Sequence, residues 1–314
     1  MYFPFLRARQ FELIALRELV KEGGILKDSI MPVLEPVRKG LNNLDLVNKV
    51  FVDNQFNAFI VVNPMTGDIT GDTDYFLDYY SSIQNSTGLI PAFHFANNSN
   101  YIKESLHKYS LSGCLLIYAN DFSDETAFKE MSCDNRITHV MIKDASRFRS
   151  LDRYFKSSNK IYIKLDDLFE KQKRNEDYLG ISAHKFSEEH LYYKSERYNG
   201  FSDYTVLPSE FTDGGSVPRA VVIHISYLNK DDDNSIWIRH FTSETNGMIS
   251  NVQGKFAEAV QKAVNFLDSH NIDNIAISEL KQNFSERKYP GLGIVKKISI
   301  KNHLIVVNSF LNNQ

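Results

Sequence analysis

The stretch YFPFLRARQFELIALRELV, residues 2–20, contains the unit from which the fold can be predicted. Its apolar run at 3–6 predicts a short strand, and the polar residues at 7–10 predict a turn. Leu13 and Leu16 then follow at the spacing that places apolar side chains on one face of a helix. The chain therefore opens with a strand, a polar turn and an amphipathic helix.

This unit recurs along the chain. The later apolar runs are continuous rather than alternating, which is typical of parallel strands covered on both faces by helices. Repetition at this spacing fits an open doubly wound sheet or a closed barrel. Seven units and an eighth strand favour an α/β fold of the TIM-type (β/α)8 barrel class. The predicted strands are 3–6, 30–34, 58–62, 89–93, 113–118, 138–142, 161–165 and 219–227.

The eighth predicted strand is delayed by a long insertion at residues 168–218, between strands 7 and 8. Insertions of this length are usually lids, binding loops or small subdomains. The acidic turn at 231–234 predicts an extra β-hairpin after strand 8. Three more helices are expected, the last of them, at 292–310, closing the barrel. No low-complexity linker interrupts the sequence, so residues 1–314 are interpreted as one domain.

The composition narrows the function classes only slightly. A formal net charge of −3 and a pI near 6.3 give no global attraction for nucleic acid, although a local basic groove stays compatible with them. Two isolated cysteines, no secretory leader and no long apolar run predict a soluble cytoplasmic protein without membrane contact.

In a βα barrel the functional groups lie where strands end and the following loops begin, so the polar residues at these points are expected at one mouth. Asp203 and His224 could join them from the insertion and from strand 8. The residues expected there are Arg7, Arg9, Gln10, Glu12, Glu35, Asn63, His94, Asn120, Asp144, Asp166 and Asp167.

Glu35, His94 and Asp144 are the catalytic candidates. A histidine that titrates near neutral pH and shares a pocket with a carboxylate is suited to proton transfer. The alternatives are that His94 is a core or rim histidine and that Asp144 caps the helix after it.

The remaining mouth residues are candidates for substrate binding. The guanidinium of Arg7 could clamp phosphate or carboxylate, or it could form a salt bridge with Glu35 on the neighbouring strand. Asn63 and Asn120 could equally serve as turn or capping residues. The candidate binding residues are Arg7, Arg9, Gln10, Glu12, Asn63, Asn120, Asp203, Tyr204 and His224.

Asp166 and Asp167, with Glu35 and Asp144, could hold a divalent cation such as Mg²⁺ through their carboxylates. No metal motif of fixed spacing, P-loop or GxGxxG pattern accompanies them. A divalent cation therefore enters only as a candidate cofactor.

The insertion is rich in aromatic residues, with Tyr192, Tyr193, Tyr198, Phe201 and Tyr204 interleaved with basic ones. Such a surface could stack bases and contact phosphate. The alternative interpretation is that these side chains fix the insertion to the barrel.

Several phrases resemble the bacterial and phage-associated "beta protein" family: YFP followed by RARQFELIALREL, then IMPVLEPV, GFSDYTV and AVVIHISY. The resemblance runs over most of the chain and implies a TIM-barrel-like fold. It also implies a gene in a mobile-element or antiphage defence region, beside a gene for a nuclease-like partner protein. The family brings no established reaction, so no catalytic residue is carried over. The positions that its members favour are Arg7, Gln10, Glu12, Glu35, Gly200, Phe201, Asp203, Tyr204 and His224.

Two functions from different classes follow. The first is a defence-system protein whose barrel mouth binds an anionic ligand, a nucleotide or nucleic-acid phosphate, and hydrolyses it as a phosphodiesterase would. The second is a non-catalytic recognition or scaffold subunit in which the insertion docks a nuclease-like partner or a phage component. A homo-oligomer is compatible with both, and the fold alone cannot choose between them.

Overall fold

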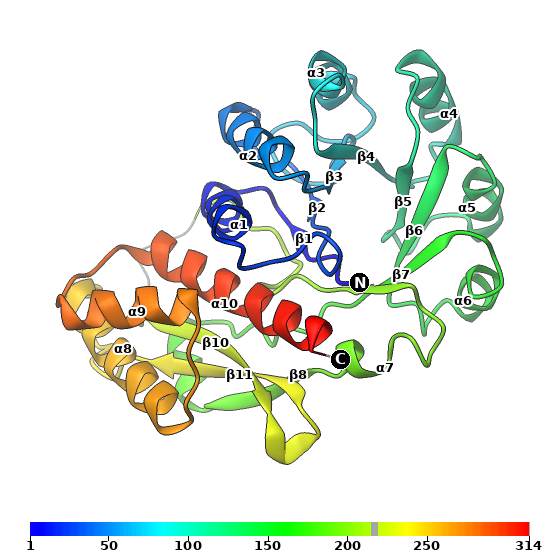
Figure 1. The fold of residues 1–314 in the computed structure, drawn as a ribbon. Helices are drawn as coiled ribbons and strands as arrows, with labels where there is room; N and C mark the ends of the chain where they lie inside the picture. The colour runs from blue at the N-terminus through cyan, green and yellow to red at the C-terminus, as the bar shows by residue number, and fades with distance from the viewer. Residues whose placement is uncertain (215–218, 314) are drawn as a thin grey trace.

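The continuous apolar runs form parallel strands around a barrel, as the sequence predicts (Figure 1). The computed structural model describes residues 1–214 and 219–313. Each barrel strand pairs in parallel with the next, and the (β/α)8 class is confirmed. In order around the barrel the strands are β1 (Phe5–Leu6), β2 (Val33–Leu34), β3 (Ala58–Val61), β4 (Leu89–His94), β5 (Cys114–Tyr118), β6 (Ile137–Lys143), β7 (Ile161–Leu165) and β9 (Gly200–Ser202).

Backbone hydrogen bonds between β9 and the start of the chain close the barrel. The Phe3 amide donates to the Phe201 carbonyl at 2.8 Å, and the Phe5 amide donates to the Asp203 carbonyl at 2.9 Å. Gly200 makes this approach possible, because a Cβ atom there would collide with the ring of Phe3.

Alternate residues of the strands point into the barrel and fill it with apolar side chains. The outward-pointing residues pack against a ring of helices, each following a strand (Figure 1). These helices are α1 (Gln10–Glu22), α2 (Asn42–Asp53), α3 (Tyr75–Ile83), α4 (Ser99–Lys108), α5 (Glu125–Ser132) and α6 (Arg149–Phe155).

The predicted position of the eighth strand was wrong. The apolar run at 219–227 contributes β10 (Val222–Asn229) to a second, antiparallel sheet, with β11 (Ser235–Thr242) and β8 (Ala183–Ser187). The barrel is closed instead by β9, which has only three residues, one a glycine and one a serine. Such a strand carries no apolar run, so hydrophobic pattern could not identify it. The predicted hairpin after strand 8 is present as β10 and β11.

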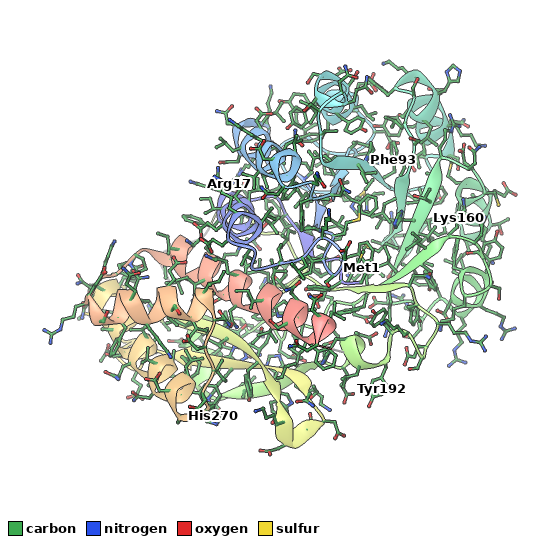
Figure 2. The ribbon with its side chains drawn as sticks, in the orientation of Figure 1. Met1, Arg17, Phe93, Lys160, Tyr192 and His270 are labelled. Carbon is green, nitrogen blue, oxygen red and sulfur yellow. The ribbon has the colours of Figure 1, made fainter. Side chains whose placement is uncertain are left out.

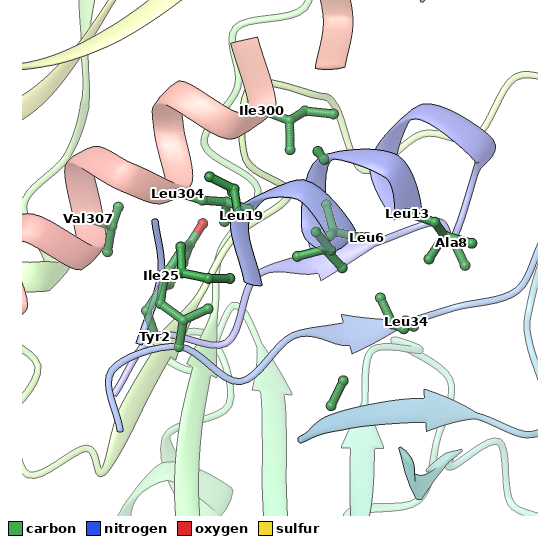
Figure 3. Close-up of a cluster of buried hydrophobic side chains, with 14 of the residues drawn as sticks. Tyr2, Leu6, Ala8, Leu13, Leu19, Ile25, Leu34, Ile300, Leu304 and Val307 are labelled. Carbon is green, nitrogen blue, oxygen red and sulfur yellow. The ribbon is translucent and has the colours of Figure 1, made fainter. Parts of the chain in front are cut away.

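The insertion after β7 contains β8 and a short helix, α7 (Glu189–Tyr192), before the chain returns to the barrel as β9. After the hairpin come α8 (Val252–Ser269), α9 (Ile275–Ser285) and α10 (Leu292–Asn312). Helix α10 lies between α1 and the second sheet (Figure 1). Ile300, Leu304 and Val307 of α10 belong to the same apolar cluster as Leu19 of α1 (Figure 3).

A buried histidine on α10 links the barrel to the second sheet. The His303 ring lies 3.1 Å from the Tyr2 hydroxyl through Nε2 and 2.8 Å from the Ser226 hydroxyl through Nδ1. The Tyr2 hydroxyl donates to Asp203 Oδ1 at 2.6 Å, so its oxygen accepts from His303 Nε2–H. The two sheets are thus tied through one imidazole.

Over the described ranges, 1–214 and 219–313, none of the helices has both the length and the apolar character needed to cross a membrane.

Candidate functional site at the barrel mouth

A ring of inward-pointing side chains lies above the apolar interior, one from the end of each barrel strand. Each of these residues lies two positions after a strand residue whose side chain fills the barrel interior. Because successive side chains of a strand alternate between its two faces, the ring residues also point inward. The exception is Tyr204, which itself packs on the interior cluster. The ring consists of Arg7, Glu35, Asn63, His94, Ala119, Lys143, Asp167 and Tyr204.

A cavity of ≈ 490 Å³ opens at this ring. The strand ends supply Arg7, Glu35, His94, Lys143 and Tyr204 to its lining. The loops above them add mainly apolar and small polar groups, including Met65, Thr66, Asn120, Phe122 and Phe211. The mouth therefore combines charged groups at the base with aromatic walls.

Arg7, Glu35 and His94 are brought together at the base of the cavity. The Arg7 guanidinium donates to Glu35 Oε2, and the other carboxylate oxygen, Oε1, lies 3.1 Å from His94 Nε2. The backbone amide of Met65 also donates to Glu35 Oε1, at 2.9 Å. The Glu35 side chain is completely buried, so its charge depends on these partners. The predicted salt bridge between neighbouring strands is confirmed.

His94 is neutral at physiological pH. Burial, reinforced by the nearby charge of Arg7, lowers the pKa of His94 to about 3. An ionised Glu35 can only accept, so the neutral ring carries its proton on Nε2 and leaves a lone pair on Nδ1. The near-neutral titration expected from the sequence was wrong, because the ring is removed from water.

Arg7 is held from several directions at once. Its second guanidinium nitrogen donates to the Ser209 carbonyl, and its centre lies 5.5 Å from the Phe5 ring and 5.3 Å from the Tyr204 ring. An anion at the mouth would therefore meet an arginine that is already paired and positioned.

Lys143 is the mouth residue that sequence reasoning missed. It ends β6, is half-buried and lines the cavity, and no carboxylate of the described residues forms an ion pair with it. Met141 points into the barrel, so alternation also directs Lys143 inward. The predicted catalytic Asp144 is on the other side of the strand end, outside the cavity lining, with a left-handed φ of +51°.

The two predicted asparagines differ. Asn120 lines the cavity, and its side-chain oxygen also accepts from the Phe122 amide at 3.0 Å. Asn63 instead ties strand ends together: it accepts from the His94 amide at 2.8 Å and donates to the His94 carbonyl at 2.9 Å. The contacts of Asn63 are therefore structural, but they join two strands rather than forming the turn or helix cap considered from sequence.

The carboxylates named for a divalent cation do not converge. Asp167 points inward and accepts from the Ser209 amide at 3.2 Å, whereas Asp166 points outward and pairs with Lys164 at 3.2 Å. Burial raises the pKa of Asp166 to about 6. No group of three or more His, Cys, Asp or Glu side chains in the part of the chain that the structure describes is placed to hold a metal ion. Adjacent residues of an extended strand face opposite sides, which explains the separation.

Asp203 and His224 are also away from the mouth. Asp203 points outside the barrel, where it accepts from the Tyr2 hydroxyl and, at 2.7 Å, from the Thr205 amide. His224 lies in the second sheet, 2.7 Å from His240 between their Nδ1 atoms. His224 is away from the mouth because its strand, β10, belongs to the second sheet and not to the barrel.

Arg9, Gln10 and Glu12 lie at the start of α1 rather than in the mouth cavity. They line a neighbouring cavity of ≈ 390 Å³. Glu12 accepts from the Arg9 amide at 3.1 Å, and the Arg9 side chain donates to the Thr212 carbonyl at 3.2 Å.

The aromatic residues of the insertion are mostly internal. Tyr193, Tyr198, Phe201 and Tyr204 are buried, whereas Tyr192 is exposed (Figure 2). The interpretation that they fix the insertion to the barrel is therefore confirmed, and they do not form an open docking surface.

The comparisons of the sequence with protein-family models and with curated proteins were negative. No protein-family model matches the sequence, and no curated protein matches it.

Proposed function

We propose that the barrel mouth binds a phosphate-bearing ligand, a nucleotide or the end of a nucleic acid. The observation that carries this function is the half-buried ammonium group of Lys143, which faces the cavity with no ion-paired carboxylate among the described residues. A cation withdrawn from water gains from a counter-charge, and a phosphate entering the mouth would supply it.

The walls of the cavity favour a ligand that also has a planar ring. Phe5, Phe95, Phe122, Tyr204 and Phe211 all contribute to the lining. Phe122 is 90% exposed, so its ring is accessible to a ligand in the cavity. Aromatic side chains beside a cation are the combination that contacts bases and phosphates together.

The arrangement supports binding more directly than hydrolysis. Both oxygens of Glu35 are engaged, and His94 has too low a pKa to be an efficient base or acid near neutral pH. We therefore propose a ligand-binding role within a bacterial mobile-element or antiphage defence system. The cellular context is supported by the resemblance of the sequence phrases.

The test is calorimetric titration with AMP and with adenosine. We expect AMP to bind at least tenfold more tightly, and Lys143→Gln to remove most of this difference because the phosphate loses its cation. Lys103→Gln is the matched control, since Lys103 is an exposed lysine of α4 outside the cavities described here. Equal affinities for AMP and adenosine, or an unaltered Lys143→Gln variant, would contradict the proposal. Chromatography of the same mixtures detects hydrolysis.

A further inference from the structure

The mouth cavity is the first of three that adjoin in series. It shares Phe5, Arg7, Tyr204 and Phe211 with a cavity of ≈ 230 Å³, so those side chains form the neck between the two. The ≈ 230 Å³ cavity in turn shares its Arg9, Glu12 and Lys296 with the ≈ 390 Å³ cavity at the start of α1. We call this series of adjoining cavities, from the mouth to the start of α1, the α1 groove.

Cations line the whole path. In order from the mouth they are Lys143, Arg7, Lys171, Arg9, Lys296 and Arg38. The acidic residues that line the same cavities are Glu35 and Asp121 in the mouth, then Glu210 and Glu12, and Arg38 also pairs with Asp68 and Asp213. Six cations along one path are nevertheless a local feature of a protein that is acidic as a whole.

Arg9 forms no ion pair among the described residues, and Lys296 forms a long one. Arg9 donates to a backbone carbonyl, that of Thr212, and its guanidinium lies 5.0 Å from the Phe211 ring. Lys296 lies 3.6 Å from Glu12 Oε1, beyond hydrogen-bond distance.

Glu12 supplies an acceptor inside the groove. Its side chain is 1% exposed, and Oε1 is buried with no hydrogen-bond partner among the described residues. An unpaired buried oxygen is costly, and a donor from a ligand would remove that cost. The amino group of a base or a sugar hydroxyl is such a donor.

Building on the mouth function above, we propose that the ligand is a single strand of nucleic acid several nucleotides long. Its end contacts Lys143, and the following phosphates run along the α1 groove past Arg9 and Lys296. The half-buried Phe211 ring at the neck supplies a stacking surface, and Glu12 accepts from a base or sugar. Cations in a row, aromatic rings and one buried acceptor match a strand better than an isolated nucleotide.

Fluorescence anisotropy with labelled oligothymidylates of two, four and six nucleotides, together with thymidine monophosphate as competitor, tests this assignment. We expect the affinity to rise at least tenfold from two to six nucleotides. Lys296→Gln and Arg9→Gln should weaken the six-nucleotide strand about 5- to 10-fold, and that loss should exceed their effect on the monophosphate at least fivefold. Each should also reduce the slope of log Kd against log salt concentration by about 0.7.

The controls separate folding from binding. Lys296→Arg keeps the positive charge beside Glu12 and should restore binding of the six-nucleotide strand. Lys103→Gln makes the same change of charge on α4 and should leave binding as in the wild type. If the substitutions instead damage the structure, the affinity for every ligand should fall by the same factor and the slope of log Kd against log salt concentration should stay as in the wild type. That result would overturn the proposal that the strand lies in the α1 groove.

The same measurements distinguish an error in the groove proposal from an error in the proposed function of the mouth. If the monophosphate binds through Lys143 but affinity does not rise with length, the groove is overturned and the mouth function stands. If the oligothymidylates bind the Arg9→Gln and Lys296→Gln variants as tightly as the wild type, the proposed path of the strand past these residues is wrong. Tighter binding of a duplex of the same length than of the single strand would overturn the substrate class.

Discussion

At the scale of single residues, the side-chain alternation of strands decided which polar groups reach the mouth. The sequence allowed Glu35, His94 and Arg7 to be identified correctly, because each ends a strand on its inward face. It misplaced Asp144 and missed Lys143, although the two are adjacent. The point where apolar character stops marks the end of β6 but not the inward side, which follows from Met141 two residues before Lys143.

The buried Glu35 gives the first prediction. Glu35→Gln leaves the Arg7 guanidinium, 17% exposed, without its carboxylate, so we expect unfolding to require roughly 3 kcal/mol less free energy. Urea unfolding followed by circular dichroism measures this loss. Asp74→Asn, which removes the acid of an exposed pair with Lys108, is the matched control and should unfold as the wild type does. An unaltered Glu35→Gln variant would show that the pair contributes nothing to stability.

At the scale of elements, the second sheet contains a chain of three imidazoles. His240 lies 2.7 Å from His224 and, through Nε2, 3.0 Å from His184 Nδ1. Burial, with a smaller effect of the neighbouring imidazoles, lowers the pKa of His224 to about 3 and that of His240 to about 2. Neutral histidines packed in this way make folding sensitive to acid.

The sign of that sensitivity follows from proton uptake. Below pH 6.5 the unfolded chain protonates His224 and His240, while the folded protein does not until their lowered pKa values are reached. Stability should therefore fall as pH is lowered from 6.5 toward 3, by up to about 1.4 kcal/mol per pH unit for each histidine.

Substitution of one of the three histidines tests whether they cause the predicted loss of stability in acid. His240→Gln should reduce the slope of unfolding free energy against pH between pH 5 and 4 by about 1.4 kcal/mol per unit. His107→Gln, on the outer surface of α4, is the control and should keep the wild-type slope. Identical slopes in the wild type and in His240→Gln would assign the acid sensitivity to other groups.

The loop after β9 is the other element with a testable role. Its residues Glu210 and Asp213 pair with Lys171 and Arg38, two cations of the α1 groove. We expect Glu210→Gln combined with Asp213→Asn to tighten binding of a six-nucleotide strand about threefold, because Lys171 loses its carboxylate and Arg38 keeps only the pair with Asp68. Anisotropy titration measures the change.

The control for the Glu210→Gln and Asp213→Asn double variant removes two negative charges at a distance from the α1 groove. Glu104→Gln combined with Glu130→Gln alters two exposed residues of α4 and α5 and should change binding little. Weaker binding in the loop variant would mean that these ion pairs position the loop for the ligand.

At the scale of the whole molecule, the architecture was predictable and one connection was not. Seven strands with clear apolar runs follow one another, and a helix of the ring follows each of the first six, which is why the barrel could be identified. The closing strand, β9, depends on backbone hydrogen bonds, on a glycine and on the single buried ring of Phe201 rather than on an apolar run. The long run in β10 belongs to a different sheet, and tertiary pairing of this kind leaves no local signal.

The shared helix α10 predicts that the barrel and the second sheet unfold together. Trp237 in β11 is the only tryptophan of the sequence, so its fluorescence reports on the second sheet, while circular dichroism reports on the whole chain. Urea transitions followed by the two signals should have the same midpoint. His303→Phe, which removes the link to Tyr2 and Ser226, should lower that midpoint. Two separate midpoints in the wild type would show that the sheets are independent units.

The route of the chain out of the barrel and back has a consequence during protein synthesis. Strand β8 leaves the ribosome about 50 residues before its partner β11, a delay of roughly 2 to 10 s at ordinary elongation rates. The closing strand β9 emerges within that interval, so the nascent chain can complete the barrel while β8 is still an unpaired edge. Translation order thus favours the barrel and its mouth as the first structure to form and the histidine-containing sheet as the last.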